Sequence, residues 1–147
     1  MFKREKDITV YQKQEYVWDF LVKYEWSRLM KEGEVTKESP SLWKVQLGEG
    51  DKANIQVIEV TFDKDKSLIE IRITPLYNKH GSYDLLQLAL YADKQKTIVK
   101  AVYEYFPTSI SEKVFAHMVN HEIGLFDIAI EELFQELNRV LMEDSYG

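Results

Sequence analysis

The sequence predicts an α+β fold in which a curved antiparallel sheet of about six strands surrounds one long C-terminal helix, with two short helices after the first strand. Two observations support this prediction. Apolar and polar residues alternate in short runs between Trp43 and Phe106, and the turns between the runs are brief. Such runs form neighbouring antiparallel strands. From about Ser109 to Met142 the pattern changes to that of an amphipathic helix.

Composition narrows the class of protein. A chain of 147 residues has the size of one domain, and we expect residues 1–147 to form one. The formal net charge of −6 supplies no basic surface, so we do not expect nucleic acid as a partner. The absence of cysteine excludes disulfides and thiolate catalysis. No run approaches the ~20 apolar residues of a membrane span and the N-terminus lacks a secretory signal, so we expect a cytoplasmic protein.

The N-terminal part should contain a short strand followed by helix. Residues Ile8–Tyr11 are expected to form the first strand, and helical spacing of apolar residues extends over about Gln14–Lys31. Two apolar stripes lie on different sides of this segment. A single helix buried on two sides would explain them, but two short helices with a break between Lys23 and Trp26 explain them better.

The middle of the chain should form the sheet. Residues Glu34–Ser41 are compatible with either a loop or a weak edge strand. The apolar phase slips at Val57-Ile58, which predicts a β-bulge. The remaining strands are expected at Trp43–Leu47, Ile55–Phe62, Ile69–Thr74, Tyr83–Tyr91 and Ile98–Phe106.

The final third of the chain has the clearest period. Ser109 and Glu112 have the spacing of a capping box, which marks a helix start. The apolar positions that follow share one broad sector, wide enough to lie across a sheet, while Glu131 and Gln135 fall on the opposite side. Phe134 is at one edge of the sector, whose other members include Phe115, Val119, Ile123, Phe126, Ile130, Leu133, Leu137 and Leu141.

One segment carries a family resemblance. The strand Ile8-Thr9-Val10 is followed by Gln14-Glu15-Tyr16-Val17-Trp18-Asp19-Phe20-Leu21, which contains the pattern V-W-x-F-L. This segment and the order of the predicted elements resemble the START-like superfamily, which includes the birch-pollen allergen family, polyketide cyclases and activators of heat-shock chaperones. The order of elements is similar over nearly the whole chain, and the motif covers about fifteen residues.

The resemblance implies a helix-grip fold, in which the sheet curls around the terminal helix and leaves a cavity between them. Members of the superfamily use this cavity for lipids, hormones or polyketides, and some act through protein contacts instead. No functional residue is shared across the superfamily, so the resemblance assigns a role to none of the residues of this chain.

Glu122 is the polar residue that the pattern singles out. It falls near the centre of the apolar sector of the C-terminal helix, where burial would raise the pKa of its carboxyl group. Such a group is a candidate for binding a ligand or for general acid–base chemistry. The alternatives are a structural contact with Arg72 or a tyrosine hydroxyl, or access of water near Gly124. Contacts of this structural kind are the commoner outcome.

His117 and His121 have the i,i+4 spacing of two metal ligands on one helix, with Glu122 next to them. The zinc-peptidase motif requires glutamate directly after the first histidine, and Met118 occupies that position. Both histidines also project toward the polar side of the helix. We therefore expect solvent-exposed histidines and no metal.

The candidate ligand-binding set combines Glu122 with apolar and aromatic residues. Its other members are Val119, Phe126, Tyr103, Tyr83 and Trp18. Large rings at such positions more often fill a core than surround a ligand. The set nevertheless favours the hypothesis that a hydrophobic small molecule or lipid binds between the sheet and the C-terminal helix.

Two other functions remain open at this point. One is a protein-interaction or chaperone-type domain that binds a protein partner and no small ligand. The other is a cyclase- or hydratase-like enzyme that works in the same cavity. The sequence indicates no catalytic residue and no cofactor, and it specifies neither a ligand nor an oligomeric state.

Overall fold

The computed structural model describes residues 2–29, 34–46, 55–76, 83–106 and 130–139. A helical segment covers residues 130–139. The elements before it are β1 (Phe2–Val10), α1 (Gln14–Lys23), the 3-10 helix η1 (Trp26–Leu29), β2 (Glu34–Ser39), β3 (Leu42–Gln46), β4 (Ile55–Asp63), β5 (Leu68–Pro75), β6 (Tyr83–Asp93) and β7 (Lys96–Phe106).

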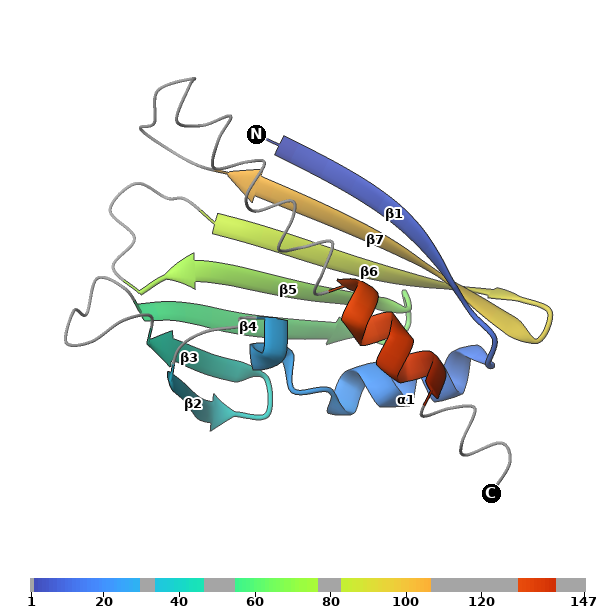
Figure 1. Ribbon diagram of the computed structural model, residues 1–147, viewed down its shortest axis with the longest axis horizontal. Coiled ribbons are helices and arrows are strands. Elements are labelled where there is room, and N and C mark those ends of the chain that lie inside the picture. The colour runs from blue at the N-terminus through green and yellow to red at the C-terminus, as the bar shows by residue number, and fades with distance from the viewer. Residues whose placement is uncertain (1, 30–33, 47–54, 77–82, 107–129, 140–147) are drawn as a thin grey trace.

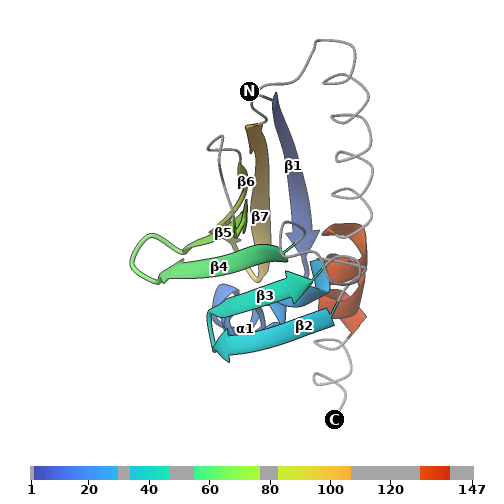
Figure 2. The same cartoon turned by 90° about the vertical axis from the view of Figure 1, so that its left-hand side faces the viewer.

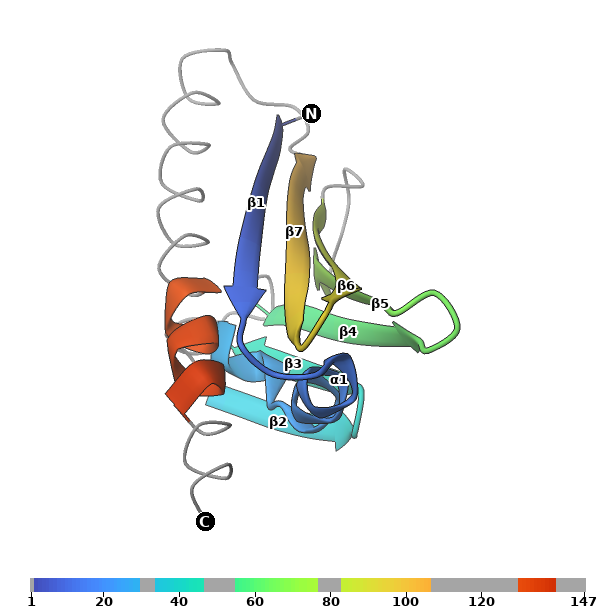
Figure 3. The same cartoon turned by 90° about the vertical axis from the view of Figure 1, so that its right-hand side faces the viewer.

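All seven strands belong to one antiparallel sheet with the order β1-β7-β6-β5-β4-β3-β2 (Figure 1). Strands β2 to β7 therefore follow each other as a meander, and β1 is added at the free edge of β7. Ser67 and Lys94, in the turns before β5 and β7, have positive φ values of 51° and 59°. Figures 2 and 3 show the sheet curling, so that β2, β3 and β4 run across the direction of β1 and β7. The predicted curved antiparallel sheet is confirmed.

The side of the sheet that faces α1 and residues 130–139 is its concave face, and it is apolar. Its buried residues come from every strand except β2. The core residues on the strands are Val10, Trp43, Val45, Ile58, Val60, Ile69, Ile71, Leu86, Leu88, Leu90, Val99, Ala101, Tyr103 and Tyr105.

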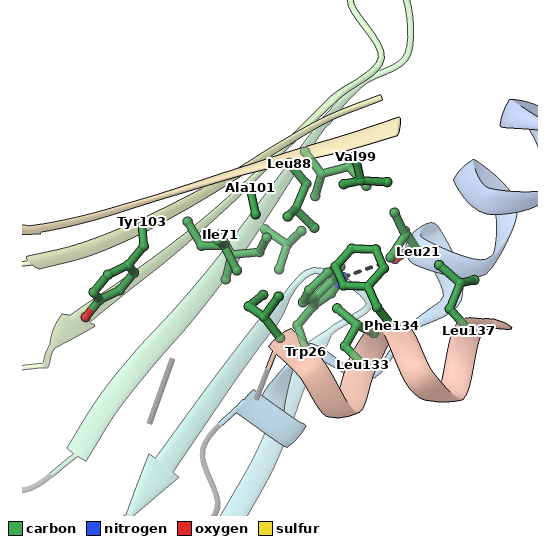
Figure 4. Close-up of a cluster of buried hydrophobic side chains, with 14 of the residues drawn as sticks. Leu21, Trp26, Ile71, Leu88, Val99, Ala101, Tyr103, Leu133, Phe134 and Leu137 are labelled. Carbon is green, nitrogen blue, oxygen red and sulfur yellow. Dashed lines mark hydrogen bonds between the residues drawn. The ribbon is translucent and has the colours of Figure 1, made fainter. Parts of the chain in front are cut away.

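The two short helices after β1 are also confirmed. The chain leaves α1 after Lys23 and begins η1 at Trp26. The indole Nε1 of Trp26 donates a hydrogen bond to the carbonyl oxygen of Leu21 at 3.1 Å, as Figure 4 shows. This bond satisfies the polar atom of a fully buried ring. The break thus places Trp26 in the core while Val17, Trp18 and Leu21 pack from α1.

Residues 130–139 pack against the concave face with the side that the sequence pattern predicts. Ile130, Leu133, Phe134 and Leu137 are buried, whereas Glu131 and Gln135 are exposed. An ion pair joins this segment to η1, because the two guanidinium nitrogens of Arg28 lie 3.1 and 2.8 Å from the two carboxylate oxygens of Glu136. The hydrogen bond that Arg28 donates to the Glu136 carboxylate raises the pKa of the Arg28 guanidinium. The predicted helix start at Ser109 lies outside the described residues.

A second ionic contact fixes the β2–β3 hairpin. Glu25, between α1 and η1, accepts hydrogen bonds from Lys37 Nζ at 2.8 Å and from Trp43 Nε1 at 3.1 Å. Lys37 also lies over the Trp43 ring, 5.7 Å from its centroid. The hydrogen bond from Lys37 holds the pKa of the Glu25 carboxyl below its ordinary value. The short edge strand β2 resolves the ambiguity over Glu34–Ser41, and this contact links its hairpin to the segment between α1 and η1.

Two details of the sheet differ from the prediction. The first strand was expected at Ile8–Tyr11, but β1 begins at Phe2 and ends at Val10. The missed half, Lys3–Asp7, consists of charged residues that sequence patterns assign to a solvated terminus. An edge strand accommodates them because its side chains remain exposed, and charge there opposes pairing with other chains.

The predicted β-bulge at Val57-Ile58 is wrong. Both residues pair in continuous register with β3 and with β5. Val57 is a half-buried residue on the convex side, so the apolar phase slips without an extra residue in the strand. The register shift in this part of the sheet lies instead between Lys37 and Ser39 of β2.

Replacing Leu133 with alanine tests the packing of the helix on the sheet. We expect the free energy of unfolding to fall by about 2–5 kcal/mol, because a fully buried leucine leaves a cavity. The control Gln135→Ala, on the exposed side of the same segment, should change it by less than about 0.5 kcal/mol. Urea denaturation followed by tryptophan fluorescence measures both variants, and equal losses would contradict this packing.

The contact of Glu25 predicts a pH effect. Because its folded-state pKa is lowered, its contribution to stability is present above the ordinary value of 4.5 and is lost as the pH falls through the folded-state pKa. Lys37→Ala should move the Glu25 pKa, measured by NMR titration of the carboxyl carbon, back toward 4.5. Lys44→Ala is the control, because Lys44 pairs with Glu38. A Glu25 pKa that ignores Lys37 would refute the contact.

Candidate functional site

The concave face is divided into an apolar region and a polar end by the register of the strands. Directly opposite residues of antiparallel strands lie on the same face of a sheet. Val60 lies opposite Ile71, Ile71 opposite Leu86, and Leu86 opposite Tyr103. This row therefore runs across four strands and ends at a tyrosine hydroxyl.

Four polar side chains gather where β1, β7 and β6 lie side by side. Arg4 of β1 is opposite Tyr103, and Asp84 of β6 is opposite Tyr105. Tyr103 and Tyr105 are buried, Asp84 is half-buried and Arg4 is exposed. We call Arg4, Asp84, Tyr103 and Tyr105 the polar end of the concave face. The two tyrosines are on β7, between Arg4 on β1 and Asp84 on β6. The polar end therefore has a cationic side toward β1 and an anionic side toward β6.

The polar end lies away from the place where α1, η1 and residues 130–139 cover the sheet. Thr97, at the other end of β7, donates a hydrogen bond from its hydroxyl to the carbonyl oxygen of Gln12, just before α1, at 2.8 Å. Figure 4 shows Tyr103 apart from the cluster formed by Trp26, Leu133 and Phe134, with its hydroxyl pointing away from them. The described helices therefore pack near one end of the concave face, and the polar end lies toward the other end of β7.

A second cation lies beside the polar end. Lys6 of β1 is opposite Ala101, so Lys6 and Arg4 occupy successive positions on the concave side of this edge strand. Both side chains are exposed. Asp84 is the acidic residue of β6 that the register places near them on the concave side, whereas Glu5 and Asp7 alternate with them on the convex side. In a chain with net charge −6, the described part of this margin is thus locally positive.

The predicted ligand-binding residues fall in different places. Tyr103 belongs to the polar end. Trp18 is buried, and its ring packs edge-on against Phe62 with centroids 6.3 Å apart, which fills the core between α1 and β4. Tyr83 lies on the convex side, where the Arg72 guanidinium is 4.7 Å from its ring centroid. Glu122, Val119 and Phe126 lie outside the described residues.

The position of Arg72 bears on one alternative for Glu122. A structural pair between Glu122 and Arg72 inside the fold requires an inward-facing arginine. Arg72 instead contributes to a hollow of about 260 Å³ on the convex side, together with Glu59, Thr61, Glu70 and Leu85. A hollow of about 330 Å³ lies at the β6–β7 turn beside Tyr11. Both are surface features outside the concave face, and the enclosed cavity stays a prediction.

The described residues contain neither a metal-binding cluster nor a membrane-spanning helix. There, no three His, Asp or Glu side chains are grouped so that they could hold a metal ion. His117 and His121 lie outside these residues. In the same part of the chain, no helix combines the length and the apolar character needed to span a bilayer.

Sequence reasoning missed three members of the polar end. Arg4 was missed because the charged N-terminus was not assigned to a strand, although Phe2, Arg4, Lys6, Ile8 and Val10 alternate as one face. The same alternation, counted back from the buried leucines of β6, assigns Asp84 to the concave face and Tyr83 to the convex face. Tyr105 is on the predicted strand face of Tyr103 and was considered as a residue that could line a pocket, but the candidate ligand-binding set did not include it.

Comparison with known proteins places the fold. No family model and no curated protein matches the sequence. An aromatase/cyclase from Streptomyces sp. R1128 superposes with a TM-score of 0.68 at 12% identity, covering 95% of each chain. Norcoclaurine synthase from Thalictrum flavum superposes with a TM-score of 0.58 at 14% identity, covering 92% of this chain and 87% of that one.

A third similar structure carries the name of the superfamily. A START superfamily protein from Mycobacterium smegmatis superposes with a TM-score of 0.53 at 11% identity, covering 92% of this chain and 98% of that one. Identities this low establish the arrangement of the backbone and no shared activity. The seven-stranded curved sheet, the short helices after β1 and the helix packed on the concave face are those of the START-like helix-grip fold.

Proposed function

We propose that this protein binds a hydrophobic small molecule between the concave face of the sheet and the C-terminal helix. The observation that carries the proposal is the composition of that face, which is apolar over four strands and ends in Arg4, Asp84, Tyr103 and Tyr105. Small-molecule sites combine mostly apolar surface with a few polar groups that fix orientation. The polar end brings several such groups together, so a ligand that contacts them would be bound in a defined direction.

The fold supports the same proposal. Similar structures include an aromatase/cyclase and a norcoclaurine synthase, whose names describe proteins that handle small organic molecules. For this chain, ligand binding is the function that we propose as the first candidate. Catalysis is a second candidate, because Asp84 and the tyrosine hydroxyls share one face and are groups that transfer protons in enzymes.

A protein-interaction domain receives less support from the surface. Large exposed apolar patches mark protein contacts, whereas single exposed apolar residues are normal. The exposed large hydrophobic side chains of the described residues are distributed over several parts of the chain, and two of them share α1: Tyr11, Tyr16, Val22, Val35, Leu76 and Tyr91. Native mass spectrometry of freshly purified protein tests the choice, because a retained small molecule supports our proposal and a retained polypeptide contradicts it.

A pair of neighbouring substitutions tests where the ligand binds. Leu86 faces the concave side and Leu85 lines the hollow on the convex side. We expect Leu86→Trp to weaken binding of a neutral apolar dye such as Nile red by at least about tenfold, because the indole takes the space of the ligand. Leu85→Trp should leave the affinity within about twofold. Dye fluorescence at increasing protein concentration measures both affinities.

The same two variants also show whether side chains already fill the space next to Leu86. If no space adjoins Leu86, the larger side chain overpacks the core and costs about 1–3 kcal/mol of stability. Thermal denaturation of the Leu86→Trp variant then gives a melting temperature well below that of Leu85→Trp. A large loss of stability, or equal dye binding by both variants, would overturn the proposed location.

A further inference from the structure

We propose that the ligand is a hydrophobic acid whose anionic group binds at the β1 margin of the concave face, beside Arg4 and the Tyr103 hydroxyl. This inference rests on the proposed function and adds the chemical class of the ligand. Arg4 and Tyr103 are directly opposite each other in the register, so a guanidinium and a phenol hydroxyl occupy the same side of adjacent strands. Both groups donate hydrogen bonds to a carboxylate.

The charge distribution selects an anion. Arg4 and Lys6 occupy successive positions on the concave side of β1, and the register places Asp84 beyond the two tyrosines of β7. The chain as a whole carries a net charge of −6. An anionic ligand is therefore repelled by the average surface and attracted to this margin. Asp84 reinforces this orientation of the ligand, because its negative charge repels a carboxylate from the β6 side of Tyr105.

The apolar part of the ligand follows from the neighbouring residues. The row that ends at Tyr103 continues through Leu86 and Ile71 to Val60, all of them buried on the concave face. A molecule whose acidic group contacts Arg4 thus extends along this row toward β4. Its hydrocarbon body would pack against these aliphatic side chains, and each buried methylene contributes about 0.8 kcal/mol in such an environment.

Another physical explanation exists for inward-facing charges on β1. Charged residues on edge strands protect a sheet against pairing with other chains. That role depends on charge along the whole edge, and Lys3 on the convex side serves it as well as Arg4 does. A role in ligand binding instead requires that the charged side chain lie on the concave side of β1. The comparison of Arg4 with Lys3 therefore separates the two explanations.

The test compares two ligands that differ only in charge. Dodecanoic acid and dodecanol are titrated against protein loaded with Nile red, and displacement of the dye gives both affinities at neutral pH. We expect the acid to bind about tenfold more tightly than the alcohol, as a charge-assisted hydrogen bond in a partly exposed site allows. The preference should shrink as the salt concentration rises.

Substitutions on β1 and β7 identify the residues that cause the preference for the acid over the alcohol. Arg4→Gln should weaken binding of the acid about tenfold and leave the alcohol unchanged. Arg4→Lys should restore part of the loss, because it retains charge without the planar guanidinium. Tyr103→Phe should weaken the acid a few-fold, and Lys3→Gln should match the wild type. Melting temperatures of all variants confirm that each is folded.

The outcomes separate the two proposals. If acid and alcohol bind equally and Arg4→Gln changes neither, the ligand is not an acid, and the proposed binding function stands. The same conclusion follows if Lys3→Gln weakens the acid as much as Arg4→Gln does. If neither the dye nor either ligand binds the wild type, the proposed function fails and this inference fails with it.

Discussion

A curved sheet can be stable only if its concave side is covered, and most of this structure follows from that constraint. The strands present aliphatic residues on one side, and α1, η1 and residues 130–139 supply Leu21, Trp26, Leu133, Phe134 and Leu137 to cover them. Apolar burial of this kind is the main favourable term in folding. The ionic contacts Arg28–Glu136 and Lys37–Glu25 are partly exposed and serve mainly to fix orientation.

The described helices cover one part of the concave face, and the candidate site lies toward the other end of β7. The described helices pack near Trp26 and Val99, whereas Tyr103 and Tyr105 occupy the opposite end of β7. A polar group on the covered half would cost free energy unless a partner satisfied it. Arg4, Asp84 and the hydroxyl groups of Tyr103 and Tyr105 belong to the other half, where both tyrosines are nevertheless buried. The separation into apolar and polar halves is thus a consequence of packing as well as a basis for binding.

Much of the fold was predictable because each element has its own period. The amphipathic pattern identified Ile130, Leu133 and Leu137 as one buried side, and alternation located the strands from β3 to β7. The break between α1 and η1 followed from two incompatible apolar stripes. These signals are local, so one sequence is enough to detect them.

The site was less predictable because it depends on register and on a single step of alternation. Asp84 and Tyr83 are adjacent, yet one faces the polar end and the other stacks with Arg72 on the convex side. Nothing in the sequence shows that Arg4 lies opposite Tyr103, because that pairing joins the first and the last strand along the chain. The charged half of β1 also lacks the β-branched residues that identify strands.

The pairing of β1 with β7 has a consequence for how the chain folds during synthesis. Each strand from β3 onward can pair with its predecessor as soon as it emerges from the ribosome, but β1 has no partner until the last strand of the sheet is made. Through that delay an apolar β1 would be a template for wrong pairing. The charged side chains of Lys3–Asp7 keep the unpaired β1 segment hydrated and oppose its pairing with other strands. The composition of β1 therefore protects the nascent chain from incorrect pairing before β7 is available.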